Sequence, residues 1–319
     1  MFYSVIVPVY NRPDEVKELL ESLTHQTYKK FEVLIIEDGS QNTCRHIAEA
    51  FTSKLDIRYY YKENSGQGFS RNYGFERAKG DYFIVFDSDC IIPRHYFSTV
   101  ENYLNKSPVD AFGGPDRAHP SFTLLQKAIS YSMTSPFTTG GIRGNKRHAG
   151  TFHPRSFNMG ISREVFEQTG GYKITRMGED IEFSIRILEA GFKSALIPDA
   201  YVYHKRRTSL SQFFKQLHFF GRARINIGRF YPSEIKAIHL LPSLFTLAFL
   251  FYLSTFFWNL ELFVLFTGIL FSFLLLIVID STFKSRNFAV GMLSAVTSVV
   301  QITAYGAGFL SELRKKVRE

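Results

Sequence analysis

Two carboxylates separated by a single residue, Asp87 and Asp89, are the side chains of this sequence most suited to chemistry. They directly follow the apolar run Tyr82–Phe86, which predicts a buried strand that ends at this point. Open α/β sheets bind ligands at the carboxyl ends of their strands, and carboxylate oxygens are ligands that Mg²⁺ or Mn²⁺ prefers. The pair therefore fits a metal ion holding a diphosphate, although a solvated turn is the simpler alternative.

Further polar clusters fall at predicted strand ends or helix starts in the first part of the chain. Because the carboxyl ends of parallel strands share one edge of a sheet, these clusters are expected to converge. With the Asp87–Asp89 pair, the clusters are Ser4–Asn11, Glu37–Ser40, Gly68–Gly74, Asp87–Asp89 and Gly178–Asp180.

Strand-like and helix-like segments alternate over the same region. After the turn at Asn11–Pro13, for example, Val16, Leu19, Leu20 and Leu23 recur at helical spacing. This alternation with short turns predicts an α/β fold whose mostly parallel sheet is flanked by helices on both faces. Strands are predicted at Tyr3–Val9, Phe31–Ile36, Ile57–Tyr61, Tyr82–Phe86 and Ala200–Tyr203, helices beginning near Pro13, Thr43, Gly68, Ser121 and Glu179, and a long loop at 135–155.

The last third of the chain is apolar enough to enter a membrane. Between Ala237 and Phe283 the only formally charged residues are Glu261 and Asp280, and residues 288–311 contain none. A bilayer crossing needs about 20 apolar residues, so the first stretch allows two transmembrane helices with a break at residues 258–261. The third stretch carries several Ser and Thr residues and Gln301, which makes it the weakest candidate.

The net charge of +9 is concentrated beside these apolar stretches. Basic residues cluster at 204–236, at 284–286 and at 314–318, which fits the positive-inside rule and anionic lipids. A nucleic-acid-binding protein is the alternative, but no recognition motif supports it. No signal peptide precedes the first strand, so the N-terminal part is expected in the cytoplasm. A third full crossing would then place the basic tail outside, against the rule; an interfacial or re-entrant third segment would keep it inside.

Taken in order and spacing, the five clusters resemble the family 2 glycosyltransferases of the GT-A fold. The resemblance covers residues 3–205 and implies a GT-A domain at 1–205 that uses a nucleotide-sugar donor. The chain after residue 205 is then predicted to contain an amphipathic interfacial segment at 206–236, a membrane region of two to three helices at 237–311 and a basic tail at 312–319.

The resemblance also implies roles for individual residues on the donor side. Asp38 accepts a hydrogen bond from the base or ribose, and Asp89 is the better direct metal ligand, with Asp87 nearer the ribose or a metal-bound water. His204 completes the metal shell in some relatives, but a surface histidine beside a basic run is an equal alternative. The implied nucleotide-sugar ligands are Pro8, Tyr10, Asn11, Asp38, Arg71, Asn72 and Asp87, and the implied ligands of Mg²⁺ or Mn²⁺ are Asp89, Asp87 and His204.

On the acceptor side, the resemblance makes Asp180 the general base. Inversion at the anomeric carbon needs one carboxylate to remove the proton of the acceptor hydroxyl, and Glu179 would orient Asp180 or the acceptor. Residues 212–224 depart from the family's Gln-x-x-Arg-Trp motif and lack a Trp. That departure disfavours a chain-threading polysaccharide synthase.

The resulting hypothesis is an inverting, metal-dependent glycosyltransferase of the cell membrane with its catalytic domain in the cytoplasm. It would transfer a sugar, most plausibly from a UDP-sugar, to a lipid-linked or membrane-proximal glycan acceptor of the cell envelope. A polyprenyl-phosphate glycosyl synthase is the alternative enzyme. A catalytically silent scaffold that binds a sugar nucleotide is the third hypothesis, and the four carboxylates Asp38, Asp87, Asp89 and Asp180 argue against it. Besides donor and acceptor, membrane lipids are the expected partners, and nucleic acid is not.

Overall fold

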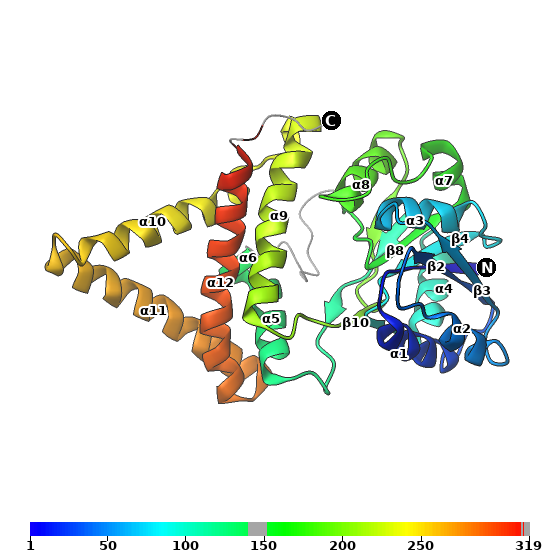
Figure 1. The fold of residues 1–319 in the computed structure, drawn as a ribbon, viewed down its shortest axis with the longest axis horizontal. Coiled ribbons are helices and arrows are strands. Elements are labelled where there is room, and N and C mark those ends of the chain that lie inside the picture. Colours follow the sequence, from blue (N-terminus) through cyan, green and yellow to red (C-terminus); the bar gives the residue numbers. More distant parts are fainter. Residues whose placement is uncertain (140–151, 314, 316–319) are drawn as a thin grey trace. The chain divides into compact units, whose positions relative to one another are not determined.

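The computed structural model describes residues 1–139, 152–313 and 315 (Figure 1). Their contacts divide them into two units. One contains the described residues of Met1–His119 and Lys146–Lys205, and the other those of Pro120–Asn145 and Arg206–Glu319. The predicted boundary at residue 205 falls between the units. The segment from Pro120, which was predicted within the first domain, instead groups with the second unit.

A mixed, mostly parallel sheet of seven strands forms the centre of the first unit. Its order is β3-β2-β1-β4-β8-β6-β9, and the first four strands of that order run parallel, as the sequence predicts. Strand β8 pairs antiparallel with both β4 and β6. The strands are β1 (Tyr3–Val9), β2 (Phe31–Asp38), β3 (Ile57–Lys62), β4 (Tyr82–Phe86), β6 (Ala111–Gly113), β8 (Asn158–Ser162) and β9 (Ser194–Leu196).

Helices cover both faces of this sheet because successive strand residues point to opposite sides. Val5 and Val7 of β1 pack in one apolar cluster, and Ile6 between them packs in the other. The first cluster contains α1 (Pro13–Thr24), α2 (Arg45–Phe51) and α4 (Tyr96–Lys106). The second contains α3 (Gln67–Phe75), α7 (Arg163–Thr169) and α8 (Glu179–Glu189), on the other side of the sheet in Figure 1.

A small second sheet brings the end of the first unit back to the acidic pair. Its order is β5-β10-β7, with β5 at Cys90–Ile91, β7 at Asp116–Arg117 and β10 at Val202–His204. The antiparallel pairing sets His204 opposite Cys90, the residue after Asp89. This short ladder fixes the position of His204 next to Asp87 and Asp89, the carboxylates predicted to bind a metal.

The second unit is helical. Its long apolar helices are α10 (Leu241–Thr255), α11 (Leu260–Ser285) and α12 (Phe288–Leu313). Helices α11 and α12 have the length and hydropathy of membrane crossings, and so does Ala237–Thr255, which extends α10 by the preceding turn. The predicted break lies between α10 and α11, where Asn259 caps α11 by accepting a hydrogen bond from the Leu262 amide at 3.0 Å. The remaining elements are α5 (Leu124–Thr134), α6 (Pro136–Thr139), α9 (Leu210–Phe230) and the short 3₁₀ turns η1 (Pro232–Glu234) and η2 (Ala237–His239).

Polar residues of α12 are buried against neighbouring helices, which explains why this stretch is the least apolar of the three. The hydroxyl of Thr297 lies 2.6 Å from that of Ser132 in α5, and Ser294 lies 2.7 Å from Ser281 in α11. Helices α9 and α12 approach so closely that a Cβ on Gly308 would lie 2.0 Å from the His218 carbonyl oxygen. Small residues at such contacts are typical of helix packing in membranes.

The predicted loop at 135–155 is wrong at its start. Residues Pro136–Thr139 form the short helix α6, because Pro136 suits a first helical position and the Thr139 amide donates to the Ser135 carbonyl at 3.0 Å. Residues 140–151 of this loop, and most of the predicted basic tail, lie outside the described residues.

Candidate active site

The structure brings the predicted metal ligands together where β4 ends and β10 ends. His204 Nε2 lies 3.0 Å from Oδ1 of Asp89 and 4.0 Å from Oδ2 of Asp87. Asp89 is buried, whereas about a third of the Asp87 side chain is exposed (33%), leaving it open to a ligand. The three residues come from distant parts of the chain and gather only because β10 pairs with β5.

Arg12 lies beside Asp89 and was missed in the sequence. Its Nη1 donates to Oδ2 of Asp89 at 2.7 Å. Burial alone would raise the pKa of Asp89, but the imidazole of His204 and the guanidinium of Arg12 outweigh it and hold that pKa well below its usual range. Asp89 is therefore ionised at neutral pH. The signal available in the sequence was the place of Arg12, one residue after Asn11 of the first cluster.

The donor atoms of this cluster fit a hard divalent cation. Among the described residues, no hydrogen-bond donor with suitable geometry reaches the buried Oδ1 of Asp89, although the His204 ring is 3.0 Å away. Cys90 lies near the same atoms, but its thiol is buried and faces the Phe157 carbonyl oxygen at 3.6 Å. Oxygen and imidazole ligands suit Mn²⁺ or Mg²⁺ better than a set that includes a thiolate.

Asp38 ends β2, and its carboxylate is surrounded by hydrogen-bond donors. Its carboxylate accepts Nζ of Lys62 at 2.5 Å and the backbone amides of Ser65 and Gly66, each at 2.9 Å. Burial would raise the pKa of Asp38, but the bonds from Lys62 and Ser65 outweigh it and lower that pKa. Lys62 was not predicted, although the parallel register places it directly beside Asp38 on β3.

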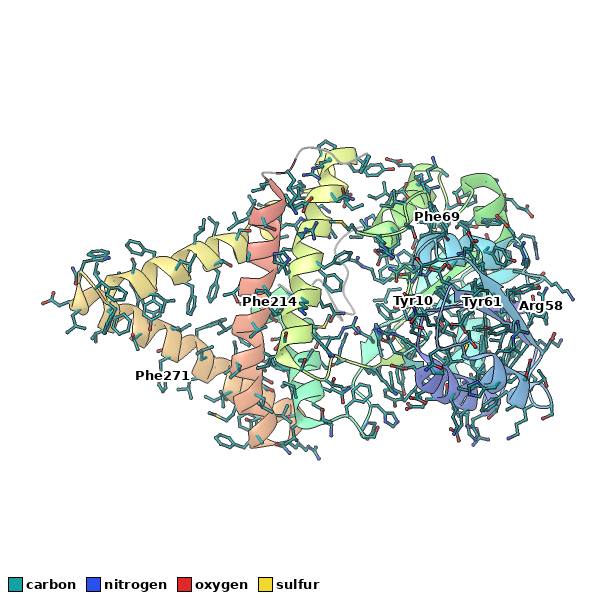
Figure 2. All side chains as sticks on the ribbon, in the orientation of Figure 1. Tyr10, Arg58, Tyr61, Phe69, Phe214 and Phe271 are labelled. Carbon is teal, nitrogen blue, oxygen red and sulfur yellow. The ribbon has the colours of Figure 1, made fainter. Side chains whose placement is uncertain are left out.

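The loop after β1 holds the other predicted donor-side residues. Asn11 adopts a left-handed backbone (φ 53°), and its side-chain oxygen accepts the amides of Gln41 and Asn42 at 2.9 and 3.0 Å. It thereby ties the loop after β1 to the loop after β2. Tyr10, labelled in Figure 2, is 53% exposed, and Pro8 is half-buried within β1. An exposed aromatic ring beside Asp38's loop can contact a flat base.

Arg71 connects the two groups of carboxylates. From α3, where it is almost fully buried, it donates through Nη2 to Asp87 at 2.9 Å and through Nη1 to Glu179 at 3.3 Å. Asn72 beside it donates through Nδ2 to the Tyr172 carbonyl oxygen and accepts the Tyr172 amide through Oδ1, each at 2.8 Å. Both predicted residues thus lie at the site, where the Nη1 and Nη2 atoms of Arg71 and the side-chain amide of Asn72 bond to other residues of the chain.

The predicted acceptor-side pair starts α8. Gly178 takes a left-handed backbone (φ 101°) before it, a conformation that favours glycine. Burial, together with the neighbouring Asp180, raises the pKa of Glu179, which accepts a hydrogen bond from Gln67. The Asp180 side chain is 20% exposed, and Oδ2 lies 3.4 Å from Nη1 of Arg155, a residue that no sequence motif marked.

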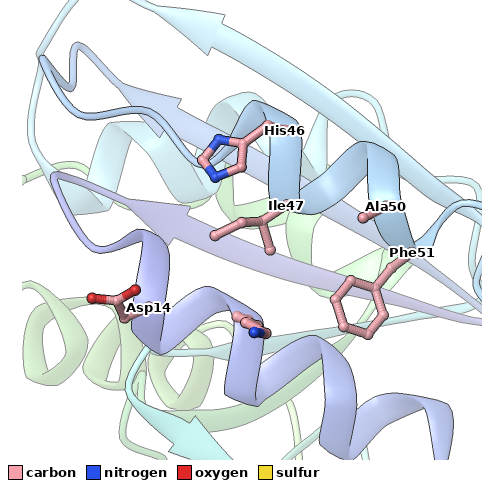
Figure 3. A pocket seen from close by; sticks show the side chains of 6 residues that line it. Asp14, His46, Ile47, Ala50 and Phe51 are labelled. Carbon is pink, nitrogen blue, oxygen red and sulfur yellow. The ribbon is translucent and has the colours of Figure 1, made fainter.

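A hollow between α1 and α2 is separate from this site. It is lined by Asp14 and Lys17 of α1 and by His46, Ile47, Ala50 and Phe51 of α2 (Figure 3). None of the predicted site residues lines it, and its walls belong to the helices rather than to the carboxyl ends of the strands. The carboxylate cluster, not this hollow, is the candidate active site.

Comparison with protein families assigns the chain. The family model described as Glycosyl transferase family 2 matches residues 4–170, more than half of the chain. The chain therefore belongs to this family and is a nucleotide-sugar glycosyltransferase.

Curated relatives agree over part of their length. Glycosyltransferase AglE of Haloferax volcanii is 26% identical over 233 residues, which make up 71% of this chain and 74% of that protein. An uncharacterized glycosyltransferase of Haemophilus influenzae is 29% identical over 214 residues, 65% of this chain and 70% of the relative. One of Rickettsia felis is 43% identical over 141 residues, 44% of this chain but only 22% of the relative.

Solved structures share the fold. A mannosyltransferase, PcManGT of Pyrobaculum calidifontis in complex with GDP-Man and Mn²⁺, aligns over 98% of this chain and 87% of its own, with a TM-score of 0.70 and 16% identity. Residues 1–349 of S. aureus TarS in complex with UDP-GlcNAc align over 71% of this chain and 67% of theirs, with a TM-score of 0.50 and 20% identity. At these identities the likeness concerns the fold, including the long apolar helices in the first case.

Proposed function

We propose that this glycosyltransferase is inverting and metal-dependent, and that it transfers a sugar from a UDP-sugar to a lipid-linked or membrane-proximal glycan acceptor. The observation that carries the proposal is the convergence of Asp87, Asp89 and His204 at one strand edge. Arg71 joins this cluster to Glu179 at the start of α8, the helix that also carries Asp180.

Asp38 and Tyr10 are the proposed contacts of the nucleoside. Asp38 is ionised and held in place by Lys62 and two backbone amides, so it can accept a hydrogen bond from a base imide or a ribose hydroxyl. Asn11 and Pro8 shape the loop on which Tyr10 stands, and the exposed ring suits a flat base.

Asp89, Asp87 and His204 would hold Mg²⁺ or Mn²⁺. When bound, the ion would neutralise the charge that develops on the departing diphosphate. Arg71 and Asn72 were predicted to bind the sugar nucleotide, and we now propose that they orient other residues of its binding site. With its guanidinium on Asp87 and Glu179, Arg71 orients both carboxylates, and Asn72 supports the Tyr172 backbone.

Asp180 is the proposed general base. Its carboxylate is partly exposed, and its Oδ1 accepts the amide of Ile181 in its own helix at 2.9 Å, which fixes the side chain. Glu179 is more deeply buried and bound to Arg71 and Gln67, so it suits a positioning role. Asp180 would therefore take the proton from an acceptor hydroxyl while Glu179 holds the start of α8.

The apolar helices support the proposed acceptor and location. Three helices of membrane length indicate membrane association, and an anchored transferase meets its acceptor at the lipid surface. We place the catalytic domain on the cytoplasmic side of the cell membrane, where nucleotide sugars are made and basic residues accumulate.

A polyprenyl-phosphate acceptor is the second candidate, and one contact favours it. Arg155 lies 3.4 Å from Asp180 and is 30% exposed, so a cation faces the place where an acceptor would enter. A phosphate is already ionised at neutral pH, so transfer to it needs no strong base.

A donor panel tests the proposal. Membranes containing the full chain are incubated with Mn²⁺ and, one at a time, UDP-, GDP- and dTDP-sugars, and lipid extracts are analysed by mass spectrometry. We expect a glycosylated lipid or glycan only with a UDP-sugar. A product made only from a GDP- or dTDP-sugar would overturn the donor assignment, and a polyprenyl-phosphate sugar would select the second candidate. The Asp89→Ala chain is the control and should give no product.

A further inference from the structure

Helices α10, α11 and α12 form three sides of a triangle (Figure 1). Helices α10 and α11 meet at one corner, where Tyr252 lies 3.2 Å from Thr267 and stacks on Phe263 at 5.1 Å. They reach α12 at separate places, α10 at Gly306 and α11 at Ser294. These two positions are about 18 Å apart along α12, at 1.5 Å per residue. Helix α12 thus connects the two open ends of the α10–α11 hairpin.

This arrangement does not allow all three helices to cross a bilayer. If the hairpin runs along the membrane normal, α12 lies across its base, in the membrane plane. If α12 crosses, the whole hairpin lies flat within the hydrocarbon. Helix α11 is the more apolar candidate and almost none of its most apolar stretch is buried, whereas about half of that stretch of α12 is buried against other helices. Hydrocarbon therefore fits the hairpin better than it fits α12.

Helix α9 provides an independent argument. It packs alongside α12, with Phe213 and Leu217 in one apolar cluster with Ala304 and with Val300 at its edge. Lys215, between those two α9 residues, is exposed, so its charge lies level with the middle of α12. A crossing α12 would carry this lysine to the bilayer centre, where charged side chains are strongly unfavourable.

We infer that α5, α9 and α12 form a platform that lies in the plane of one leaflet, and that only the α10–α11 hairpin crosses the membrane. The partner of this platform is an anionic lipid surface. Its basic residues can face headgroups, and its exposed apolar side chains can enter the outer hydrocarbon. Of the basic residues of α9, Lys215 is exposed and Arg224 is half-buried, whereas Arg222 and Arg229 form ion pairs with Glu312 of α12. The exposed apolar side chains of α12 include Phe288, Met292 and Val296.

The platform resolves the conflict over the tail of the chain. With an even number of crossings, Lys315 after α12 lies on the same side as the start of α9, and so do Lys284 and Arg286 at the end of α11. All the basic segments then face one leaflet, as the positive-inside rule requires. The inference concerns the membrane alone and does not depend on the donor or acceptor.

Tryptophan depth tests whether α12 lies in the plane. The chain has one Trp, Trp258 at the hairpin tip, so Trp258→Phe gives a blank background. In that background, Val296→Trp reports the middle of α12 and Phe271→Trp the middle of α11. Figure 2 shows Phe271 pointing away from its helix, and Phe271 is 65% exposed. The full chain is reconstituted in vesicles containing lipids brominated near the headgroup or near the acyl-chain end.

We expect Val296→Trp to be quenched more strongly by lipids brominated near the headgroup, and Phe271→Trp to show the reverse order. Stronger quenching of Val296→Trp by the deep label, equal to that of Phe271→Trp, would overturn the inference.

Labelling with a membrane-impermeant maleimide tests the crossing number. Glu261→Cys marks the hairpin tip and Lys315→Cys the end of α12, and the unsubstituted chain is the control because Cys44 and Cys90 are buried. We expect the two sites to react from opposite sides of the membrane in intact and permeabilised cells. Reaction of both from the same side would overturn the inference.

Discussion

The two units keep polar groups buried in different ways. In the first unit, which contains the candidate active site, buried charged groups are balanced by opposite charges or backbone amides. Examples are Asp38 with Lys62 and Arg71 between two carboxylates. In the second unit, buried hydroxyls at helix contacts pair with each other, as in Ser132 with Thr297 and Ser281 with Ser294. This unit also buries one charged cluster, Glu312 of α12 with Arg222 and Arg229 of α9.

The difference follows from what each unit must do. A buried charge is costly unless it is paired, and losing one partner leaves an expensive unpaired ion. That cost is accepted where the proposed diphosphate and metal would be held. Hydroxyl pairs between helices contribute little each, but they need no counter-ion and allow close packing. Substitutions should therefore have severe effects at the buried ion pairs of the first unit and mild effects at the hydroxyl contacts of the second.

Metal removal should have the largest effect on the catalytic unit. We expect EDTA, or Asp89→Ala, to reduce turnover roughly 10³–10⁴-fold, because a bound cation contributes several kcal/mol to stabilisation of developing charge. Sugar transfer is assayed with and without excess Mn²⁺. Mn²⁺ should rescue the EDTA-treated chain but not Asp89→Ala, and the exposed Asp56→Ala should behave like the unsubstituted chain. Full activity in EDTA would contradict the metal site.

The change Asp180→Asn tests the base. The amide is nearly isosteric but cannot take a proton, so turnover should fall roughly 10²–10⁴-fold while donor affinity changes little. Turnover and donor binding are measured separately, with Glu164→Gln in the first turn of α7 as the control. Near-normal turnover would remove the general-base assignment and favour a phosphate acceptor.

The change Lys62→Met should destabilise the chain by about 1.5–3 kcal/mol at pH 7, the usual contribution of a hydrogen bond to a charged group. The pair lowers the pKa of Asp38, so its contribution is complete above the unfolded pKa of about 3.9 and lost as pH falls through the folded pKa. Denaturant unfolding of the detergent-solubilised chain should therefore show a difference from the parent that disappears in acid. The exposed Lys106→Met is the control, and a difference independent of pH would argue against the pair.

The change Ser132→Ala should have the smallest effect, about 0.6 kcal/mol, because it removes only a hydroxyl that contacts Thr297 and Ser298 of α12. Unfolding in mixed micelles measures it. Ser272→Ala is the matched control, since that exposed hydroxyl bonds only within its own helix. A loss as large as that of Lys62→Met would erase the contrast between the units.

The fold of the first unit could be predicted because its signals are local. Strand patterns, helix spacing and turn residues gave the mostly parallel sheet, and the break before α11 was marked by Trp258–Glu261. The grouping of α5 with the second unit could not be predicted. Its partners, such as Thr297, lie far along the chain, and nothing in residues 124–134 identifies them.

In the candidate site, too, residues marked by a local motif could be predicted, and residues that only the folded chain brings together could not. Each predicted residue could be named from a motif, but Arg12, Lys62 and Arg155 carry no motif and become visible only when strand ends and loops are assembled. Lys62 was the most accessible of the three, because a parallel register places it beside Asp38.

The close approach of α9 and α12 restricts how this sequence can diverge. A methyl group on Gly221 would lie 2.1 Å from the Tyr305 carbonyl oxygen, and one on Gly308 would lie equally close to the His218 backbone. Relatives that retain this helix pair are therefore expected to retain glycine at both positions. Relatives that carry larger residues there must separate the helices, and in them the membrane part will have a different architecture under a similar catalytic sheet.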